Sequence, residues 1–144
     1  MKARATIDLL SVIRMRLALL ALLPLLPSVA HAQKKWTSIG STSTGNPVYV
    51  DARSVKRTGD LVSATVRVVF VKPVATPKGD WQSGHVVGTY DCAKKSVAAK
   101  EQTYYGDKAE TKVLEHKVNK MPGYGPALGG SLPAVALDYL CKSK

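Results

Sequence analysis

The sequence predicts an α+β fold, in which an antiparallel sheet of about 5–6 strands carries one C-terminal helix packed on one face. Two patterns predict this class. Most of the chain consists of short apolar runs separated by turn residues, whereas residues 132–141 show helical spacing. A third observation, the cysteine pair Cys92 and Cys141, predicts that a disulfide ties the helix to the sheet.

The N-terminal segment has the features of a secretory signal peptide. Two arginines precede an apolar stretch at residues 17–30, and small residues follow at the point where a signal peptidase cleaves. A membrane-spanning helix needs roughly 20 apolar residues, whereas this stretch is shorter and contains two prolines. We therefore expect cleavage between Ala32 and Gln33, so that residues 1–32 are removed and residues 33–144 form the mature domain.

A compact signal of this kind begins at Met15, and we hypothesise that translation starts there rather than at Met1. N-terminal sequencing of a precursor that begins at Met1 would contradict this. No cysteine follows the apolar stretch to accept a lipid at the cleavage site. We expect a soluble exported protein, periplasmic or extracellular, with no lipid anchor and no transmembrane segment in the mature chain.

Strands are expected wherever apolar residues alternate between turn signals. The strongest is Leu61–Val71, in which every second residue from Val62 to Phe70 is apolar. Lys72 and Pro73 are expected to end it, leaving a loop over residues 72–83. The further strands are expected at residues 36–40, 48–50, 84–92, 97–105 and 111–118, whereas residues 51–59 and 119–130 are expected to be turns and irregular segments.

The helix is expected to begin after Ser131, a good N-cap, and it tolerates Pro133 in its first turn. Helical spacing predicts that four residues face the sheet. They are Leu132, Val135, Ala136 and Tyr139.

The cysteine count supports export independently of the signal. An even number of cysteines in an exported chain indicates a disulfide, and two free thiols are the alternative. Closing a loop of about 50 residues stabilises a fold by about 4 kcal/mol in the chain-entropy model.

Several of these features together resemble the surface-adhesin protein E-like family of small exported bacterial proteins. They are Trp36 with Ile39, the triplet Tyr49-Val50-Asp51, Ser54, Gly59 before a long strand, the strand end Tyr90-Asp91-Cys92, a proline–glycine–serine segment, and a C-terminal helix ending at Cys141. The resemblance implies a sheet of about six strands with the helix tied to its concave face. It also implies binding rather than catalysis, because the founding member attaches bacteria to host extracellular-matrix proteins.

No catalytic or metal-binding set is recognisable in the sequence. The mature chain contains two histidines, His85 and His116, and neither has a further ligand at metal-binding spacing. We expect a protein that is not an enzyme and has no cofactor. A weaker alternative, an enzyme acting on envelope material, depends only on His85 and Asp91.

The mature chain carries a net charge of +8, from 17 Lys and Arg against 9 Asp and Glu. Such a surface attracts polyanions, although a solvated lysine-rich face is the default interpretation. Too few aromatics lie among the lysines for specific nucleic-acid binding. The candidate binding residues are Lys94, Lys95, Lys100, Lys108 and Lys112, followed by Lys117 and Lys120.

Trp81 has two interpretations: an exposed contact anchor in the 72–83 loop, or a ring that folds back over the sheet edge. The leading functional hypothesis is a non-enzymatic binding module for a host matrix protein or a polyanionic envelope component. The alternative is a soluble periplasmic protein with a structural or envelope-maintenance role.

Overall fold

The computed structural model describes residues 36–142. The expected signal peptide, the cleavage site at Ala32 and Gln33, and the start at Met15 lie outside these residues.

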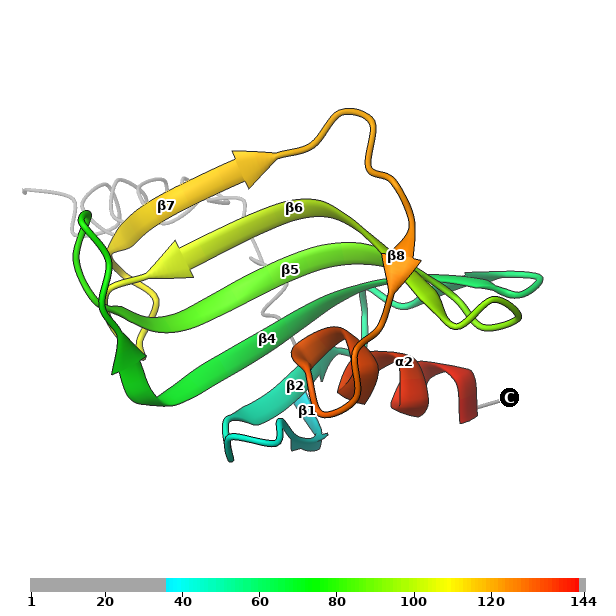
Figure 1. Cartoon of the computed structure of the whole chain (residues 1–144), viewed down its shortest axis with the longest axis horizontal. Helices are drawn as coiled ribbons and strands as arrows, with labels where there is room; N and C mark the ends of the chain where they lie inside the picture. The colour runs from blue at the N-terminus through cyan, green and yellow to red at the C-terminus, as the bar shows by residue number, and fades with distance from the viewer. Residues whose placement is uncertain (1–35, 143–144) are drawn as a thin grey trace, which may run out of the picture. The chain divides into compact units, whose positions relative to one another are not determined.

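Eight strands of the described chain form one antiparallel sheet in the order β1-β2-β4-β5-β6-β7, with β3 added beside β4 and β8 beside β6 (Figure 1). The helix α2 spans Leu132–Lys142. The strands are β1 Trp36–Ser41, β2 Pro47–Asp51, β3 Lys56–Thr58, β4 Leu61–Val74, β5 Trp81–Asp91, β6 Ser96–Tyr105, β7 Val113–Val118 and β8 Gly125–Pro126. The α+β architecture is confirmed. The count is eight rather than 5–6 because β3 and β8 are too short to predict.

The alternation of β4 builds the core. Val62, Ala64, Val66 and Val68 point to one face of the sheet and are buried there. Valines of β2 pack beside them, and α2 covers this face together with Tyr90 of β5. The strands β2, β4 and β5 therefore each contribute one apolar face to the core, as the period of two predicts.

The expected end of β4 at Lys72 and Pro73 is wrong, because the strand continues to Val74. The register shifts at this point: Val69 pairs with Ser83, whereas Val74 pairs with Trp81. Proline is tolerated in a strand where the hydrogen-bond ladder is already interrupted. The 72–83 loop is therefore shorter than expected, and Trp81 begins β5 instead of lying in a loop.

The helix begins as predicted, with the backbone N–H of Ala134 donating to the Ser131 hydroxyl. Three of the four residues predicted to face the sheet do so: Ala136 is buried, and Leu132 and Val135 are partly buried against the core. The prediction is wrong for Tyr139, which is 37% exposed. Leu137 and Leu140, which are buried, were missed.

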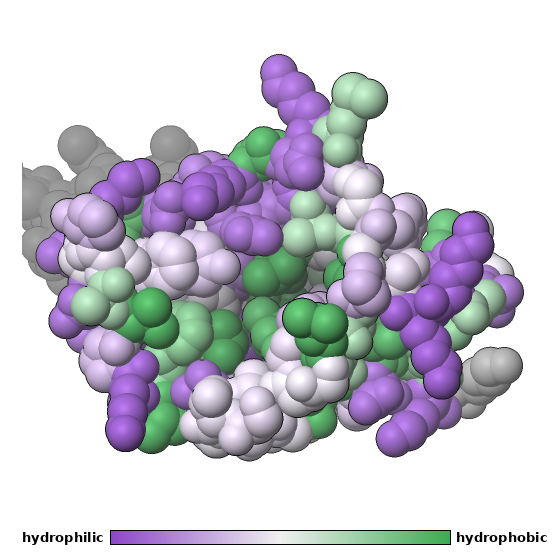
Figure 2. All heavy atoms as spheres, in the orientation of Figure 1, coloured by the Kyte–Doolittle hydropathy of each residue, from purple (hydrophilic) through white to green (hydrophobic). Residues whose placement is uncertain are grey.

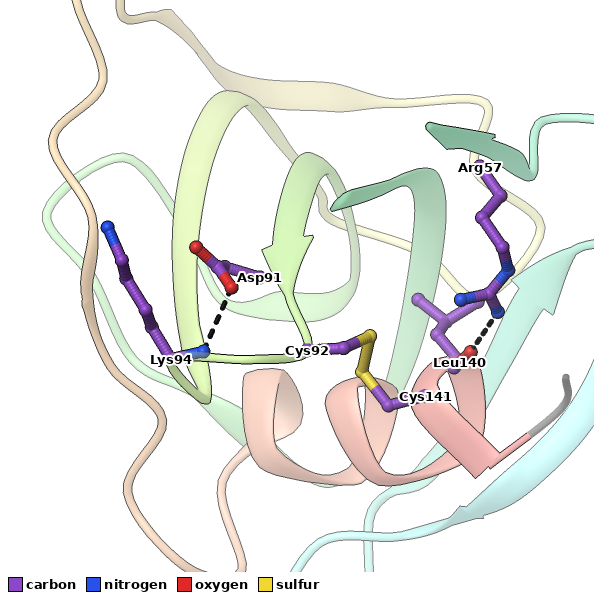
Figure 3. Close-up of a disulfide and its surroundings, with 6 residues drawn as sticks. All are labelled: Arg57, Asp91, Cys92, Lys94, Leu140 and Cys141. Atoms are coloured by element: carbon purple, nitrogen blue, oxygen red, sulfur yellow. Dashed lines mark hydrogen bonds between the residues drawn. A yellow bond between two sulfur atoms is a disulfide. The ribbon is translucent and has the colours of Figure 1, made fainter. Parts of the chain in front are cut away.

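The predicted disulfide is confirmed. Cys92, directly after β5, is bonded to Cys141 in the last turn of α2, with 5.5 Å between the two Cα atoms (Figure 3). The Arg57 guanidinium of β3 donates to the carbonyl of Leu140 in the same turn. This carbonyl is one of the groups that a helix end leaves without an intrahelical partner. One covalent bond and one charged donor therefore hold the C-terminal turn of α2.

Candidate binding surface and groove

The structure does not gather the candidate lysines into one patch. Lys94 and Lys95 lie in the turn between β5 and β6, whereas Lys108 and Lys112 lie in the loop that follows β6 at its other end. β6 has 10 residues, and a strand of that length spans about 33 Å. Lys100 and Lys117 line one pocket, on the β6–β7 part of the sheet. The candidate lysines are close together in the sequence, but the fold places Lys94 and Lys95 far from Lys108 and Lys112.

Trp81 folds back onto the sheet, which is the second of its two interpretations. Its ring stacks on Tyr104 of β6, with 3.8 Å between centroids and 6° between planes. The Tyr104 ring fits here because residue 84 is a glycine: a Cβ at this position would lie 2.8 Å from the ring. Trp81 therefore packs on Tyr104, whose ring lies over Gly84.

An apolar groove with a volume of about 590 Å³ lies on the face of the sheet that carries α2. β4, β5 and β6 form its floor with apolar and aromatic side chains. The turn at residues 42–46 and the segment 125–133 form its walls. Figure 2 shows apolar residues gathered at a hollow near the centre of this face. The apolar floor comprises Val68, Phe70, Val86, Tyr90, Val97, Ala99 and Tyr104, with Gln102 beside them.

A smaller basic pocket adjoins the groove and shares Ala99 and Gln102 with it. Lys100 and Lys117 line this pocket. Lys117 Nζ lies 3.1 Å from Oε1 of Glu115.

Glu115 also pairs with Lys78 at 3.5 Å. The hydrogen bond from Lys117 is the main reason why the pKa of Glu115 lies below its ordinary value. Lys100 forms no ion pair with any residue of the described chain.

The edge strand β7 and the segment after it form the most exposed apolar surface, which we call the 113–128 surface. Five large apolar side chains protrude there, and Met121 is 89% exposed. The lysines of β7 and of the following turn lie in the same stretch. The exposed apolar residues are Val113, Val118, Met121, Tyr124 and Leu128. This combination was not recognised from the sequence, where residues 119–130 indicated only an irregular connection.

The opposite face of the sheet holds a compact polar cluster. Arg67 of β4 forms an ion pair with Glu110, and its guanidinium lies 5.7 Å from the rings of Trp36 and Tyr49. His85 of β5 is 6% exposed, and its Nε2 lies 2.8 Å from Oε2 of Glu110. This contact brings the imidazole against the Glu110 carboxylate and helps to stabilise its charge.

Glu110 has a φ of 63°, in the left-handed region, and it lies in the loop between β6 and β7. Burial acts to raise its pKa, but the contacts with His85 and Arg67 outweigh burial and hold the pKa below its ordinary value. The Arg67 guanidinium also donates to the carbonyl of Lys108 at 2.9 Å. These contacts fasten the β6–β7 loop to the sheet.

The polar cluster contains only one of the two residues on which the enzyme alternative depends. His85 faces Glu110 and Tyr105 rather than Asp91, which instead accepts a hydrogen bond from the backbone of Lys94. No group of three or more His, Cys, Asp or Glu side chains in residues 36–142 has the arrangement of a metal site. Within the same range, no helix is long and apolar enough to cross a membrane.

Comparisons with known proteins agree with this fold. The family model described as surface-adhesin protein E matches residues 36–142. The crystal form II structure of Haemophilus influenzae protein E has a TM-score of 0.52 and 15% identity, covering 73% of this chain and 87% of that one.

The selenomethionine form of the same Haemophilus influenzae protein has a TM-score of 0.51 and 14% identity, with coverage of 74% and 86%. At this identity the likeness shows the fold alone. No curated protein sequence matches the chain. The family match extends over the whole described domain, and the chain belongs to the surface-adhesin protein E family.

Proposed function

We propose that the protein is an exported, non-enzymatic adhesin that binds a host extracellular-matrix protein through the 113–128 surface. Membership of the surface-adhesin protein E family supports an adhesive role. The observation that carries the proposal is the exposure of five large apolar side chains in the edge strand β7 and in the segment that follows it in the chain.

Exposed apolar patches of this kind mark protein interaction sites, because leaving them in water costs free energy. β7 also pairs on one side only, with β6. Its outer edge offers unpaired backbone groups to an extended segment of a partner. Lys117 and Lys120 add positive charge to this edge, so an acidic, partly apolar segment is the best complement.

The polar cluster supports a non-enzymatic role. Its charged groups face one another and hold a loop, and the groups that a substrate would need are already occupied. The expectation that no cofactor is required is part of this proposal.

A solid-phase assay tests the proposal. The purified mature protein is applied to immobilised collagen, fibronectin and laminin, with heparin as a polyanion. We expect saturable binding to at least one matrix protein. A Met121→Ser/Leu128→Ser variant should bind at least tenfold more weakly, because both side chains are exposed and contribute contact rather than stability.

Val71→Ser is the matched control, since Val71 is an exposed apolar residue outside the 113–128 surface. An equal loss in this variant would overturn the assignment of the surface. Binding to heparin alone, abolished by salt, would assign the protein to a polyanionic envelope component instead.

Fractionation of the cells, followed by intact mass of the mature chain, tests export. We expect the protein at the cell surface or in the medium, with Gln33 at its N-terminus, no lipid and two mass units lost to the disulfide. Confinement to the osmotic-shock fluid would favour the periplasmic envelope-maintenance alternative and contradict an adhesin.

A further inference from the structure

The apolar groove is a second feature of the molecule, and it adjoins the 113–128 surface, because Gly125 and Pro126 form part of its wall. Its floor presents partly exposed apolar side chains from three adjacent strands, including Val86 and Ala99. Its volume of about 590 Å³ lies within the roughly 300–1,000 Å³ of small-molecule sites. Water in such a groove is released favourably when an apolar ligand enters.

The groove has no charged lining. Among the described residues, those that form its floor and walls are apolar, aromatic or neutral polar. A charged part of a ligand must therefore lie outside the groove. The adjoining basic pocket supplies the charges at this point, because it shares Ala99 and Gln102 with the groove and contains Lys100 and Lys117.

We propose that this pair of pockets binds a single-chain fatty acid, with the acyl chain on Val86 and Ala99 and the carboxylate on Lys100 and Lys117. This inference goes beyond the proposed adhesive function and does not depend on it. A single chain suits one narrow groove, and an anionic end suits the two lysines.

The existing contacts favour a carboxylate as the headgroup. Lys117 already holds the carboxylate of Glu115 at 3.1 Å, so its ammonium is positioned for oxygen ligands of this kind. Glu115 competes for Lys117, and Lys100 is therefore expected to provide most of the charge for the ligand. Because this contact is near the surface, it should weaken with salt.

The proposal is tested with purified mature protein and dodecanoate, below the concentration at which micelles form. Calorimetry should show saturable binding at one site, and octanoate should bind more weakly because it buries less apolar area. Dodecanol, with the same chain and no charge, should bind more weakly than dodecanoate. Lys100→Gln/Lys117→Gln should weaken dodecanoate binding roughly tenfold and leave dodecanol binding unchanged.

The matched control is Lys94→Gln/Lys95→Gln, which removes the same charge at the turn between β5 and β6. It should bind dodecanoate like the wild type. An equal loss in both double variants would overturn the assignment of the headgroup site.

A second pair of variants tests the groove. Ala99→Phe fills it and should abolish binding of both dodecanoate and dodecanol. Val87→Phe adds the same volume to a partly exposed position on the other face, because Val87 pairs with Thr65 rather than with the groove residues. It should leave binding intact, and circular dichroism should show that both variants fold.

Absence of saturable dodecanoate binding by the wild type would overturn the proposal. So would binding that survives Ala99→Phe, or dodecyl phosphate binding more than tenfold tighter than dodecanoate. The Met121→Ser/Leu128→Ser variant should retain dodecanoate binding, so that failure of the adhesive function and failure of the fatty-acid site are distinguishable.

Discussion

On the face of the sheet that α2 covers, valines, Tyr90 and Leu140 pack together, and a disulfide fastens the helix. On the opposite face, charges hold a loop in place, with Glu110 between Arg67 and His85. Both arrangements arise from the same strands. Val66 and Val68 of β4 face the helix, and Arg67 between them faces the polar cluster.

The two faces of the sheet should therefore respond differently to pH and salt. Burial of apolar surface and a covalent bond are nearly insensitive to pH and salt in the neutral range. Ion pairs depend on the protonation of a carboxylate and are screened by salt unless they are buried. The face that α2 covers should therefore contribute most of the free energy of unfolding. The opposite face, which carries Glu110, should determine how that free energy changes with pH.

The largest effect is expected from removing the disulfide. Cys92→Ser/Cys141→Ser should lower the free energy of unfolding by about 4 kcal/mol, because the bond closes a loop with a sequence separation of 49 residues. Urea unfolding measures this. Reduction of the wild type should have the same effect, and a loss below about 1 kcal/mol would show that packing alone holds α2.

The second effect concerns the packing under the helix. Leu140→Ala should cost about 3 kcal/mol, since Leu140 is fully buried in the core. Leu128→Ala is the control, because Leu128 is exposed and should change stability by less than about 0.5 kcal/mol. Equal losses in the same urea assay would contradict the core assigned here.

The third effect tests the loop side. Glu110→Gln should lower stability at pH 7 by about 1–2 kcal/mol, because Arg67 loses its partner. The pKa of Glu110 is lowered in the folded state. Its contribution is therefore present above the unfolded pKa of about 4.3 and is lost as pH falls through the lower folded pKa.

Wild-type stability measured between pH 3 and pH 7 should thus fall below about pH 4.3, and the fall should be smaller in Glu110→Gln. Glu101→Gln is the control, since Glu101 is on the exposed part of the same sheet face. If stability depended on pH in Glu110→Gln as it does in the wild type, the loss of stability in acid would have to come from other groups.

The smallest effect is expected from the charged contact on the helix side. Arg57→Ala should cost about 0.5–1 kcal/mol, because its guanidinium donates to a carbonyl at the C-terminal end of α2. The loss should shrink at high salt. Lys56→Ala, on the same short strand, should have no measurable effect, and an equal loss there would assign the stabilisation to β3 in general.

Sequence patterns predicted the parts of the fold that depend on local periodicity. The alternation from Val62 to Val68 identified the central strand and its buried face, and the even cysteine count identified the bridge. β3 and β8 were missed because three and two residues carry no periodic signal. Their pairing depends on neighbours that are distant in the sequence.

The face of the helix was predicted correctly except at Tyr139. Leu132, Val135 and Ala136 pack against the core, whereas the buried Leu137 and Leu140 were missed. Helical spacing admits neighbouring apolar stripes, and the bond from Cys141 to Cys92 is a constraint that the spacing does not contain.

The basic character of the candidate site could be predicted from the sequence, but its position in the fold could not. Positive charge indicated a basic surface, yet only Lys100 and Lys117 of the seven lysines meet in a pocket. The groove could not be predicted, since its floor comes from three strands and its walls from two separate segments. Gly84 was the one local signal, because a glycine within an apolar strand marks the close approach of another group, here Tyr104.

The position of the disulfide has a mechanical consequence. When the chain is pulled from its two ends, the bond between Cys92 and Cys141 carries the load past the chain between them. Force applied on either side of this loop passes through the two sulfur atoms. The chain between the two cysteines has 49 residue steps, about 160 Å when extended, and it carries no tension. The strands β6 and β7 and the 113–128 surface therefore remain folded at loads that would unravel the strands before them.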